Sequence, residues 1–215
     1  YALLDLTRPE YDAYYLGFAN RTLWPLLHLQ PNLVDYGRAD HAGYLEVNRL
    51  FARELAPLLR ADDRIWVHDY HLIPLASELR ELGIGNRIGF FLHVPLPPAQ
   101  LLATLPGHEH LFSCFGAYDL VGVQTRDDLR ALHDYLREEA GARIEPDGRV
   151  TMPGGRGFAS AAFPISIDTE GVARQAAGAA RSEANARLRT SLEGRALAIG
   201  IDRLDYSKGL PKRFE

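Results

Sequence analysis

The sequence predicts an α/β fold: a doubly wound, Rossmann-like parallel sheet, followed by the first elements of a second Rossmann-like domain. Two patterns predict it. Short segments that are apolar throughout, without the alternation of a half-exposed strand, are typical of parallel strands buried on both faces. Helical patterns lie between them, and strands that alternate with helices form βαβ units. The predicted strands are residues 64–68, 87–92, 120–123 and 196–201.

The helices are predicted from apolar residues at helical spacing. In residues 44–59 the apolar stripe includes Leu45, Leu50 and Leu55, with charged residues on the other side. Residues 73–82 and 127–139 show the same pattern. An Ala- and Arg-rich stretch at 170–192 predicts one long helix.

Residues 142–163 break this alternation and predict a hairpin. The Gly-rich stretch 154–157 has the composition of a phosphate-binding loop, but it follows no buried strand and opens no helix. A hairpin turn is therefore the better interpretation. We place a domain boundary near Asp168, with an N-terminal domain at residues 1–167. A linker helix and the start of a C-terminal domain follow at 168–215.

Composition argues against several classes of function. Lys and Arg number 24 and Asp and Glu number 28, so the net charge is −4, and no run of like charge forms a nucleic-acid-binding arm. No apolar run is long enough to span a bilayer. Cys114 is the single cysteine, so no disulfide forms within the chain and a reducing, cytoplasmic compartment is expected. Nucleic acid and membrane are not expected partners.

Both ends of the chain look cut. The first residues form no secretory signal, since they lack a basic region and carry an early acid at Asp5. The chain does not begin with Met, starts inside an apolar run, and ends where a helix should begin. We therefore expect it to be a fragment of a longer protein.

Polar residues follow the predicted strands, at the edge where open parallel sheets bind ligands. Asp69 follows the first strand and His93 the second. A carboxylate and a neutral imidazole both bind sugar hydroxyls, so this pair is a candidate binding site. In a second interpretation His93 caps its strand and Asp69 the next helix. In a third, His68, Asp69, His71 and His93 bind a metal ion, although adjacent strand residues point to opposite faces and no Cys joins them.

Arg203 and Lys208 form a second candidate site, in the loop between the last predicted strand and a helix. Gly209 gives this loop flexibility, and Pro211 fits the first turn of the helix. Two cations beside a helix N-terminus favour a phosphate group. A solvated basic loop is the alternative interpretation.

Two aromatic motifs lie near the start of the chain, Tyr14-Tyr15 and Trp24-Pro25. Aromatic residues of an early helix usually pack in the core, and Pro25 indicates that this helix ends at Trp24. From pattern alone we assign these side chains to packing.

Together, these motifs resemble the trehalose-6-phosphate synthases. The similar blocks occur in the right order and run across the whole chain, so their combination is highly specific, although His-Val-Pro alone is not. They are Tyr14-Tyr15, NRTLWP at 20–25, WVHDYHL at 66–72, RIGFFLHVP at 87–95, DLVGVQT at 119–125, FPISID at 163–168 and RLDYSKGLP at 203–211.

The resemblance implies a GT-B fold, in which two Rossmann-like domains face each other across the active site. It implies the transfer of glucose from a nucleotide-glucose, usually UDP-glucose, to glucose 6-phosphate, with retention of the anomeric configuration. It implies that neither a metal ion nor a cofactor is needed.

The resemblance also implies a role for each candidate residue on the acceptor side. Tyr15 and Trp24 match acceptor-site residues near the glucose 6-phosphate, which replaces their assignment to packing. Asp69 matches a ligand of sugar hydroxyls in the same region.

On the donor side, His93 matches a contact to the transferring glucose. Arg203 and Lys208 match the pair that holds the donor diphosphate, in agreement with the phosphate site predicted from the loop. The resemblance thus implies that His93, Arg203 and Lys208 are the catalytic residues of this chain.

Two parts of the family lie outside this chain: a Gly-containing loop with a phosphate-binding Arg upstream, and a segment with acidic residues that hold the ribose and the donor sugar downstream. We therefore expect little or no turnover from this chain alone.

Other functions stay open. They are a non-catalytic sensor of sugar phosphate, a synthase with another acceptor, such as a glucosylglycerol-phosphate synthase or a cyclitol-coupling enzyme, and an epimerase of the same fold. Arg203 and Lys208 disfavour the sensor, and the acceptor-side blocks disfavour the epimerase. Whether the protein forms a homo-oligomer also stays open.

Overall fold

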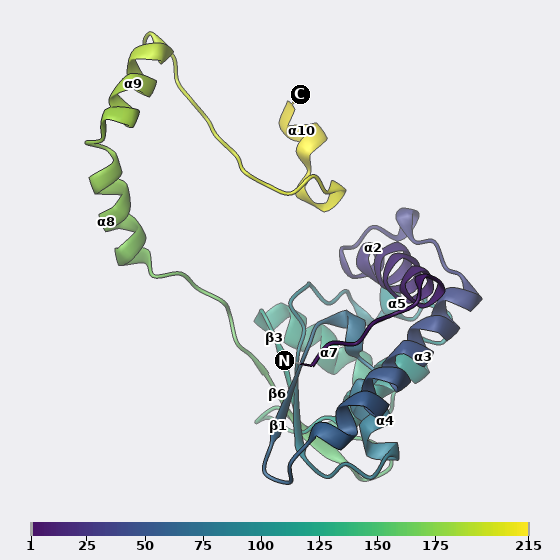
Figure 1. Cartoon of the computed structure of the whole chain (residues 1–215). Helices are drawn as coiled ribbons and strands as arrows, with labels where there is room; N and C mark the ends of the chain where they lie inside the picture. The colour runs from purple at the N-terminus through teal and green to yellow at the C-terminus, as the bar shows by residue number, and fades with distance from the viewer. Residues whose placement is uncertain (1, 215) are drawn as a thin grey trace. The chain divides into compact units, whose positions relative to one another are not determined.

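A computed structural model describes residues 2–214 and divides the chain into two compact units, the first ending at Pro164 and the second beginning at Ile165 (Figure 1). The assignment of these units to the two domains of a GT-B enzyme stays a prediction. Among the described residues, no helix has both the length and the apolar character needed to cross a bilayer.

The first unit contains a mostly parallel sheet with the strand order β1-β2-β3-β6-β5-β4. Its parallel strands are β1 (Arg64–His68), β2 (Arg87–Phe91), β3 (Leu120–Val123) and β6 (Gly157–Ala162). The short strands β5 (Arg149–Thr151) and β4 (Arg143–Ile144) continue the sheet in antiparallel order. Three of the predicted strands and the predicted hairpin, formed by β5 and β6, are confirmed.

One face of the sheet is buried, and the other is largely exposed or half-buried in β1, β2 and β6. The register places Val67, Phe90, Val121 and Ser160 side by side in one row, and all four are buried. The neighbouring row contains Trp66, which is 68% exposed, and residues that are exposed or half-buried. The prediction of strands buried on both faces is therefore wrong for β1, β2 and β6, whereas Val121, Gly122 and Val123 of β3 are all buried. The uniformly apolar character of β1 and β2 reflects apolar side chains on the exposed face as well as on the buried one.

Helices and short helical turns connect these strands (Figure 1). Those of the first unit are α1 (Arg8–Tyr11), η1 (Asp12–Leu23), α2 (Trp24–Leu27), η2 (Pro31–Leu33), α3 (Arg38–Leu55), η3 (Ala56–Leu58), η4 (Tyr70–Leu72), α4 (Leu75–Glu81), α5 (Ala99–Leu102), α6 (His108–Ser113), η5 (Cys114–Ala117) and α7 (Arg126–Glu138). Three predicted helices are confirmed as α3, α4 and α7. Helix α3 begins six residues earlier than predicted, and Gly37 is its N-cap.

Helices α1, η1 and α2 form one continuous helical run that passes through Pro25. The prediction that the helix ends at Trp24 is wrong. A proline inside a helix removes one backbone N–H donor from its hydrogen-bond pattern. In the turn before Pro25, the Arg21 carbonyl accepts a hydrogen bond from the Asp35 N–H at 2.9 Å. The loop after α2 therefore supplies a donor to this part of the helix.

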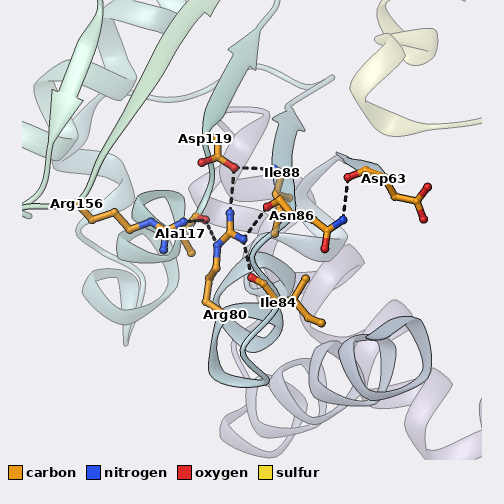
Figure 2. Close-up of polar contacts among 8 residues, drawn as sticks. All are labelled: Asp63, Arg80, Ile84, Asn86, Ile88, Ala117, Asp119 and Arg156. Carbon is orange, nitrogen blue, oxygen red and sulfur yellow. Dashed lines mark hydrogen bonds and ion pairs between the residues drawn. The ribbon is translucent and has the colours of Figure 1, made fainter. Parts of the chain in front are cut away.

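A hydrogen-bond network around Arg80 joins the amino ends of the parallel strands (Figure 2). The Arg80 guanidinium donates to three backbone carbonyls and pairs with one carboxylate: Ala117 O at 3.2 Å, Ile84 O and Asn86 O at 2.7 Å each, and Asp119 Oδ2 at 3.0 Å. Asp119 Oδ2 also accepts the Ile88 N–H at 2.7 Å. This network lies at the edge of the sheet opposite to the carboxyl ends, where Asp69 and His93 follow β1 and β2.

Cys114 lies in the core of the first unit. Burial raises the pKa of its thiol to about 11. The side chain is therefore protonated at neutral pH and behaves as a small apolar residue.

The second unit consists of α8 (Thr169–Ala179), α9 (Glu183–Leu192), η6 (Tyr206–Lys208) and α10 (Leu210–Phe214). The single helix predicted at 170–192 is wrong, because Ser182 ends the run by capping a new helix: its side chain accepts the Asn185 N–H at 3.2 Å. The strand predicted at 196–201 is also absent from the described residues. Its apolar side chains are exposed, with Ile201 at 93%, and no strand of the described residues pairs with this segment.

Candidate functional site

The carboxyl ends of β1 and β2 bring Asp69 and His93 together. The Asp69 N–H donates to Phe91 O at 2.8 Å, which extends the pairing of the two strands by one residue. The His93 N–H donates in turn to Asp69 Oδ1 at 3.3 Å. Asp69 precedes η4, but its side chain forms no cap hydrogen bond there. The structure therefore places both predicted residues at one edge of the sheet and directs the Asp69 carboxylate toward His93.

Asp69 has an unusual backbone conformation, with φ 71° and ψ 167°. This region of φ and ψ is essentially restricted to glycine, and a residue with a Cβ is strained there. The conformation also interrupts the alternation of side chains at the end of β1. His68 and Asp69 both contact His93, but at different atoms: the His68 ring contacts the His93 ring, and the Asp69 carboxylate accepts the His93 backbone N–H.

His68 contacts His93 directly. The Nδ1 atom of His68 lies 2.9 Å from Nε2 of His93, and the rings are nearly parallel at 21°. Phe91 packs against the His93 ring, with 4.8 Å between centroids, and Trp66 packs against His68 at 4.4 Å. In the described part of the chain, no group of three or more His, Cys, Asp or Glu residues is arranged to hold a metal ion.

A π-helix positions the two aromatic candidates of the acceptor side. Tyr15 lies within η1, which is a π-helix of 12 residues, and Trp24 follows its last residue. The Trp24 N–H donates to Ala19 O, five residues earlier, as in π-helical hydrogen bonding. In an α-helix, residues nine apart lie on opposite sides, because each residue turns about 100°. A π-helix has roughly 4.4 residues per turn, so the same nine residues complete about two turns. The helix type thus brings Tyr15 and Trp24 to one side.

Aromatic contacts confirm that Tyr15 and Trp24 face the same segment, the turn η4 that follows Asp69. Tyr15 stacks on His71 at 5.5 Å and 14° between ring planes. Trp24 contacts Tyr70 at 5.9 Å, and Tyr70 contacts His71 at 4.1 Å. Tyr15 is 38% exposed and Trp24 is half-buried, whereas Tyr14 is part of the core. The packing interpretation therefore holds for Tyr14 and for the half-buried Trp24, which packs against the core, while the ring of Tyr15 remains accessible at η4.

The His71 ring stacks on the Tyr15 ring as a neutral imidazole. Burial lowers the pKa of His71, and the charge of Asp69 partly opposes this effect. Its Nε2 atom is buried and has no hydrogen-bond partner among the described residues. A neutral ring stacks on Tyr15 without placing a cation beside the site.

The loop at 202–209 in the second unit carries Arg203 and Lys208, and both side chains are exposed. Gly209 ends η6 with φ 62°, a left-handed conformation that suits glycine, and α10 begins at the next residue. Arg213 Nη2 pairs with Asp202 Oδ2 at 2.8 Å and donates to Lys208 O at 3.4 Å. Arg213 thus joins both ends of the loop that carries the two candidate cations.

Sequence reasoning missed His68, His71 and Arg213 as site-supporting residues. His68 and His71 were considered as metal ligands only. Strand pairing contained a signal for His68, because the last residue of β1 lies opposite Phe91, two residues before His93. Thr125, another polar residue after a strand, has a structural role: it caps α7 in a reciprocal arrangement with Asp128.

Comparison with known proteins identifies close relatives. The profile of glycosyltransferase family 20 matches residues 2–215. A curated trehalose-6-phosphate synthase of Sinorhizobium fredii is 50% identical over 215 residues, which make up 100% of this chain and 46% of the relative. A curated synthase of Cronobacter sakazakii is 41% identical, again over 100% of this chain and 45% of the relative. This chain thus spans about half the length of the curated relatives it matches.

The chain is also similar to solved structures of the same kind of protein as these curated relatives. An α,α-trehalose-phosphate synthase (UDP-forming) from Burkholderia xenovorans, in complex with glucose-6-phosphate, matches 97% of this chain and 46% of its own with a TM-score of 0.89 and 47% identity. A trehalose-6-phosphate protein from E. coli, bound with UDP-2-fluoro glucose, matches 97% of this chain and 46% of its own with a TM-score of 0.89 and 42% identity. These matches confirm the resemblance and the predicted α/β, GT-B fold class.

Proposed function

The chain belongs to glycosyltransferase family 20, and we propose that the full-length protein is an α,α-trehalose-6-phosphate synthase to which this chain contributes the acceptor side and part of the donor side. The proposed reaction transfers glucose from UDP-glucose to glucose 6-phosphate with retention of the anomeric configuration. The observation that carries the proposal is the convergence of His93, Asp69 and the Tyr15 stack at the carboxyl ends of β1 and β2. An open parallel sheet binds ligands at this edge.

The acceptor side combines a carboxylate with accessible aromatic surface. An ionised carboxylate accepts hydrogen bonds only, so Asp69 suits the hydroxyl groups of glucose 6-phosphate. Tyr15 and Trp24 offer ring surface for the apolar faces of a sugar, and both contact the turn η4 that follows Asp69. The synthase from B. xenovorans, 47% identical to this chain, was crystallised with glucose-6-phosphate.

The donor side is proposed to use two cations for the leaving group. A departing nucleoside diphosphate gains negative charge as the glycosidic bond breaks. Arg203 and Lys208 would stabilise this charge more strongly in the transition state than in the ground state, which lowers the barrier. His93 would contact the transferring glucose. The E. coli relative, 42% identical, was crystallised with UDP-2-fluoro glucose.

A substrate panel on the full-length protein tests this function. UDP-, GDP- and ADP-glucose are each combined with glucose 6-phosphate, glycerol 3-phosphate or a cyclitol. NMR then identifies the product and its anomeric configuration. We expect α,α-trehalose 6-phosphate, formed fastest from UDP-glucose. Binding of glucose 6-phosphate without any affinity for a nucleotide-glucose would instead identify a sensor. A product from another acceptor would identify a synthase of different specificity.

The same assay on the 215-residue chain tests the division of the active site. We expect little or no nucleotide release from the chain alone, because the proposed site also needs residues that precede and follow it. Full turnover from the purified chain would contradict this expectation.

A further inference from the structure

His68 lies beside His93, and nothing in the proposed reaction yet uses it. The Nδ1 atom of His68 and the Nε2 atom of His93 are 2.9 Å apart, a hydrogen-bond distance between two ring nitrogens. A neutral imidazole carries one N–H donor and one bare acceptor nitrogen. One ring therefore donates in this contact, and the other accepts. The tautomers of the two histidines are linked through the shared proton.

We infer that His68 is a positioning residue for His93 in the glucosyl transfer proposed above, on which this inference rests. The contact occupies Nε2 of His93, so that Nδ1 is the ring nitrogen left for a sugar hydroxyl. The hydrogen bond also fixes the rotation of the His93 ring. Without it, the packing of Phe91 is the restraint that remains on the exposed ring among the three contacts described below.

The linked tautomers match the chemistry of a hydroxyl group. When His93 donates to His68, the Nδ1 atom of His93 is a bare acceptor. When His68 donates, Nδ1 of His93 carries the proton and is a donor. A sugar hydroxyl both donates and accepts, so the pair complements it in either arrangement with no change in total charge.

Three contacts hold His93, and two of them come from the end of β1. The backbone N–H bonds to Asp69 Oδ1, the ring nitrogen bonds to His68, and Phe91 packs against the ring. His68 is the last residue of β1, and Trp66 packs against its ring. A support that is built on a strand holds a functional side chain more precisely than one built on a loop.

Kinetics of the full-length protein test the inference with two substitutions. His68→Ala removes the partner of His93 and is expected to lower kcat/KM for UDP-glucose about 3- to 10-fold, the effect of one hydrogen bond between neutral groups. The KM for glucose 6-phosphate should not change. His68→Asn places an amide near the former Nδ1 position and is expected to restore most of the loss. Wild-type kinetics for His68→Ala would overturn the inference. An equal loss of kcat/KM in His68→Ala and His68→Asn, with the thermal stability of both unchanged, would overturn it as well.

A second measurement does not depend on activity. The ¹⁵N shifts of the His93 ring in the labelled 215-residue chain report its tautomer and hydrogen bonding. They are expected to change on His68→Ala and to return toward wild-type values on His68→Asn. Unchanged shifts would show that the two rings are not bonded and would overturn the inference. If the shifts behave as expected but the full-length protein transfers no glucose, the proposed function fails, and the role of His68 in it fails as well.

Discussion

Asp69 combines a candidate ligand with a strained backbone. Its φ of 71° and ψ of 167° lie in a region that is essentially reserved for glycine, and such strain costs on the order of 1–3 kcal/mol. The strain is maintained by contacts on both sides, the bond to Phe91 O and the bond from the His93 N–H. Removing the strain should therefore stabilise the protein at the expense of the site.

Two substitutions of Asp69 separate the strain from the carboxylate. Asp69→Gly and Asp69→Ala both remove the carboxylate, but only glycine adopts this conformation freely. We expect the glycine variant to be more stable than the alanine variant by about 1–3 kcal/mol in urea unfolding. Glu46, an exposed residue inside α3, is the control. There the order should reverse, with alanine about 1 kcal/mol more stable than glycine. The same order at both positions would contradict strain at Asp69.

Arg203 tests the donor side at the scale of one residue. In the full-length protein, Arg203→Ala is expected to lower kcat/KM about 10- to 100-fold, because one charge-assisted contact with the leaving diphosphate contributes about 1.5–3 kcal/mol. Arg187→Ala, at an exposed position of α9, is the control and should leave turnover unchanged. Steady-state assays with UDP-glucose measure both. Equal kcat/KM for Arg203→Ala and the wild type would remove Arg203 from the mechanism.

At the scale of elements, the packing of α3 against η1 determines where Tyr15 and Trp24 lie. Gly43 of α3 faces Ala13 of η1, and a Cβ added at Gly43 would lie only 2.5 Å from the Ala13 Cβ. A Cβ atom cannot rotate away, so the two helices would have to separate. The position of η1, and with it the acceptor side, therefore depends on a glycine in the neighbouring helix.

Gly43→Ala is expected to destabilise the protein by about 1–3 kcal/mol, the usual effect of an overpacked contact. In the full-length protein it should also raise the KM for glucose 6-phosphate more than the KM for UDP-glucose. Gly178→Ala in α8 is the matched control, since a Cβ there meets no atom within 4 Å. It should stabilise by about 0.5–1 kcal/mol. Urea unfolding and initial rates give both quantities. An equally tolerated Gly43→Ala would show that close approach of the helices is not required.

Sequence patterns predicted the elements whose signal is local. Strands β1 and β3 were predicted with the correct bounds, because each is a short apolar run that ends in polar residues. Asp69 and His93 could be placed at one edge for the same reason, since parallel neighbouring strands end at the same side. The break at Ser182 was missed, because an Ala- and Arg-rich pattern continues across it.

Features that depend on tertiary contacts could not be predicted. The π-helical form of η1 changes the relation between Tyr15 and Trp24, and their spacing in the sequence does not reveal it. The contact of the Asp69 carboxylate with the His93 N–H accompanies a φ angle of 71° at Asp69, which a residue with a Cβ rarely adopts. The segment 196–201 has the composition of a strand, but a strand exists only where another strand pairs with it.

For the molecule as a whole, the network of Arg80 holds the sheet at the edge opposite to the site. Arg80→Lys keeps the charge, but a single ammonium group cannot contact Ala117 O, Ile84 O, Asn86 O and Asp119 at once. We expect a loss of about 2–3 kcal/mol in the free energy of unfolding. Arg130→Lys, which alters an exposed pair with Asp127, should cost less than about 0.5 kcal/mol. Equal losses in both variants would contradict a structural role of the network.

The stability of the protein should also depend on pH through three half-buried histidines. Burial lowers the pKa of His41, His71 and His133 below the ordinary value of 6.5. The unfolded chain therefore binds protons near pH 6 that the folded chain does not bind, and the stability falls as the pH decreases below about 6.5. Thermal unfolding at pH 8, 7 and 6 should show little change between the first two and a lower Tm at pH 6. His71→Gln should reduce this decrease, and a Tm that rises toward pH 6 would contradict the prediction.

The burial of Cys114 has a practical consequence for spectroscopy. A core thiol with a pKa of about 11 reacts slowly with maleimides at neutral pH, so the native chain provides a nearly unlabelled background. Cysteines introduced at Gln100 and Thr190, which are exposed and belong to different units, would then accept a pair of fluorophores selectively. Energy transfer between the dyes would then report whether the distance between the two labelled positions changes as nucleotide-glucose and sugar phosphate are added, without removal of the native cysteine.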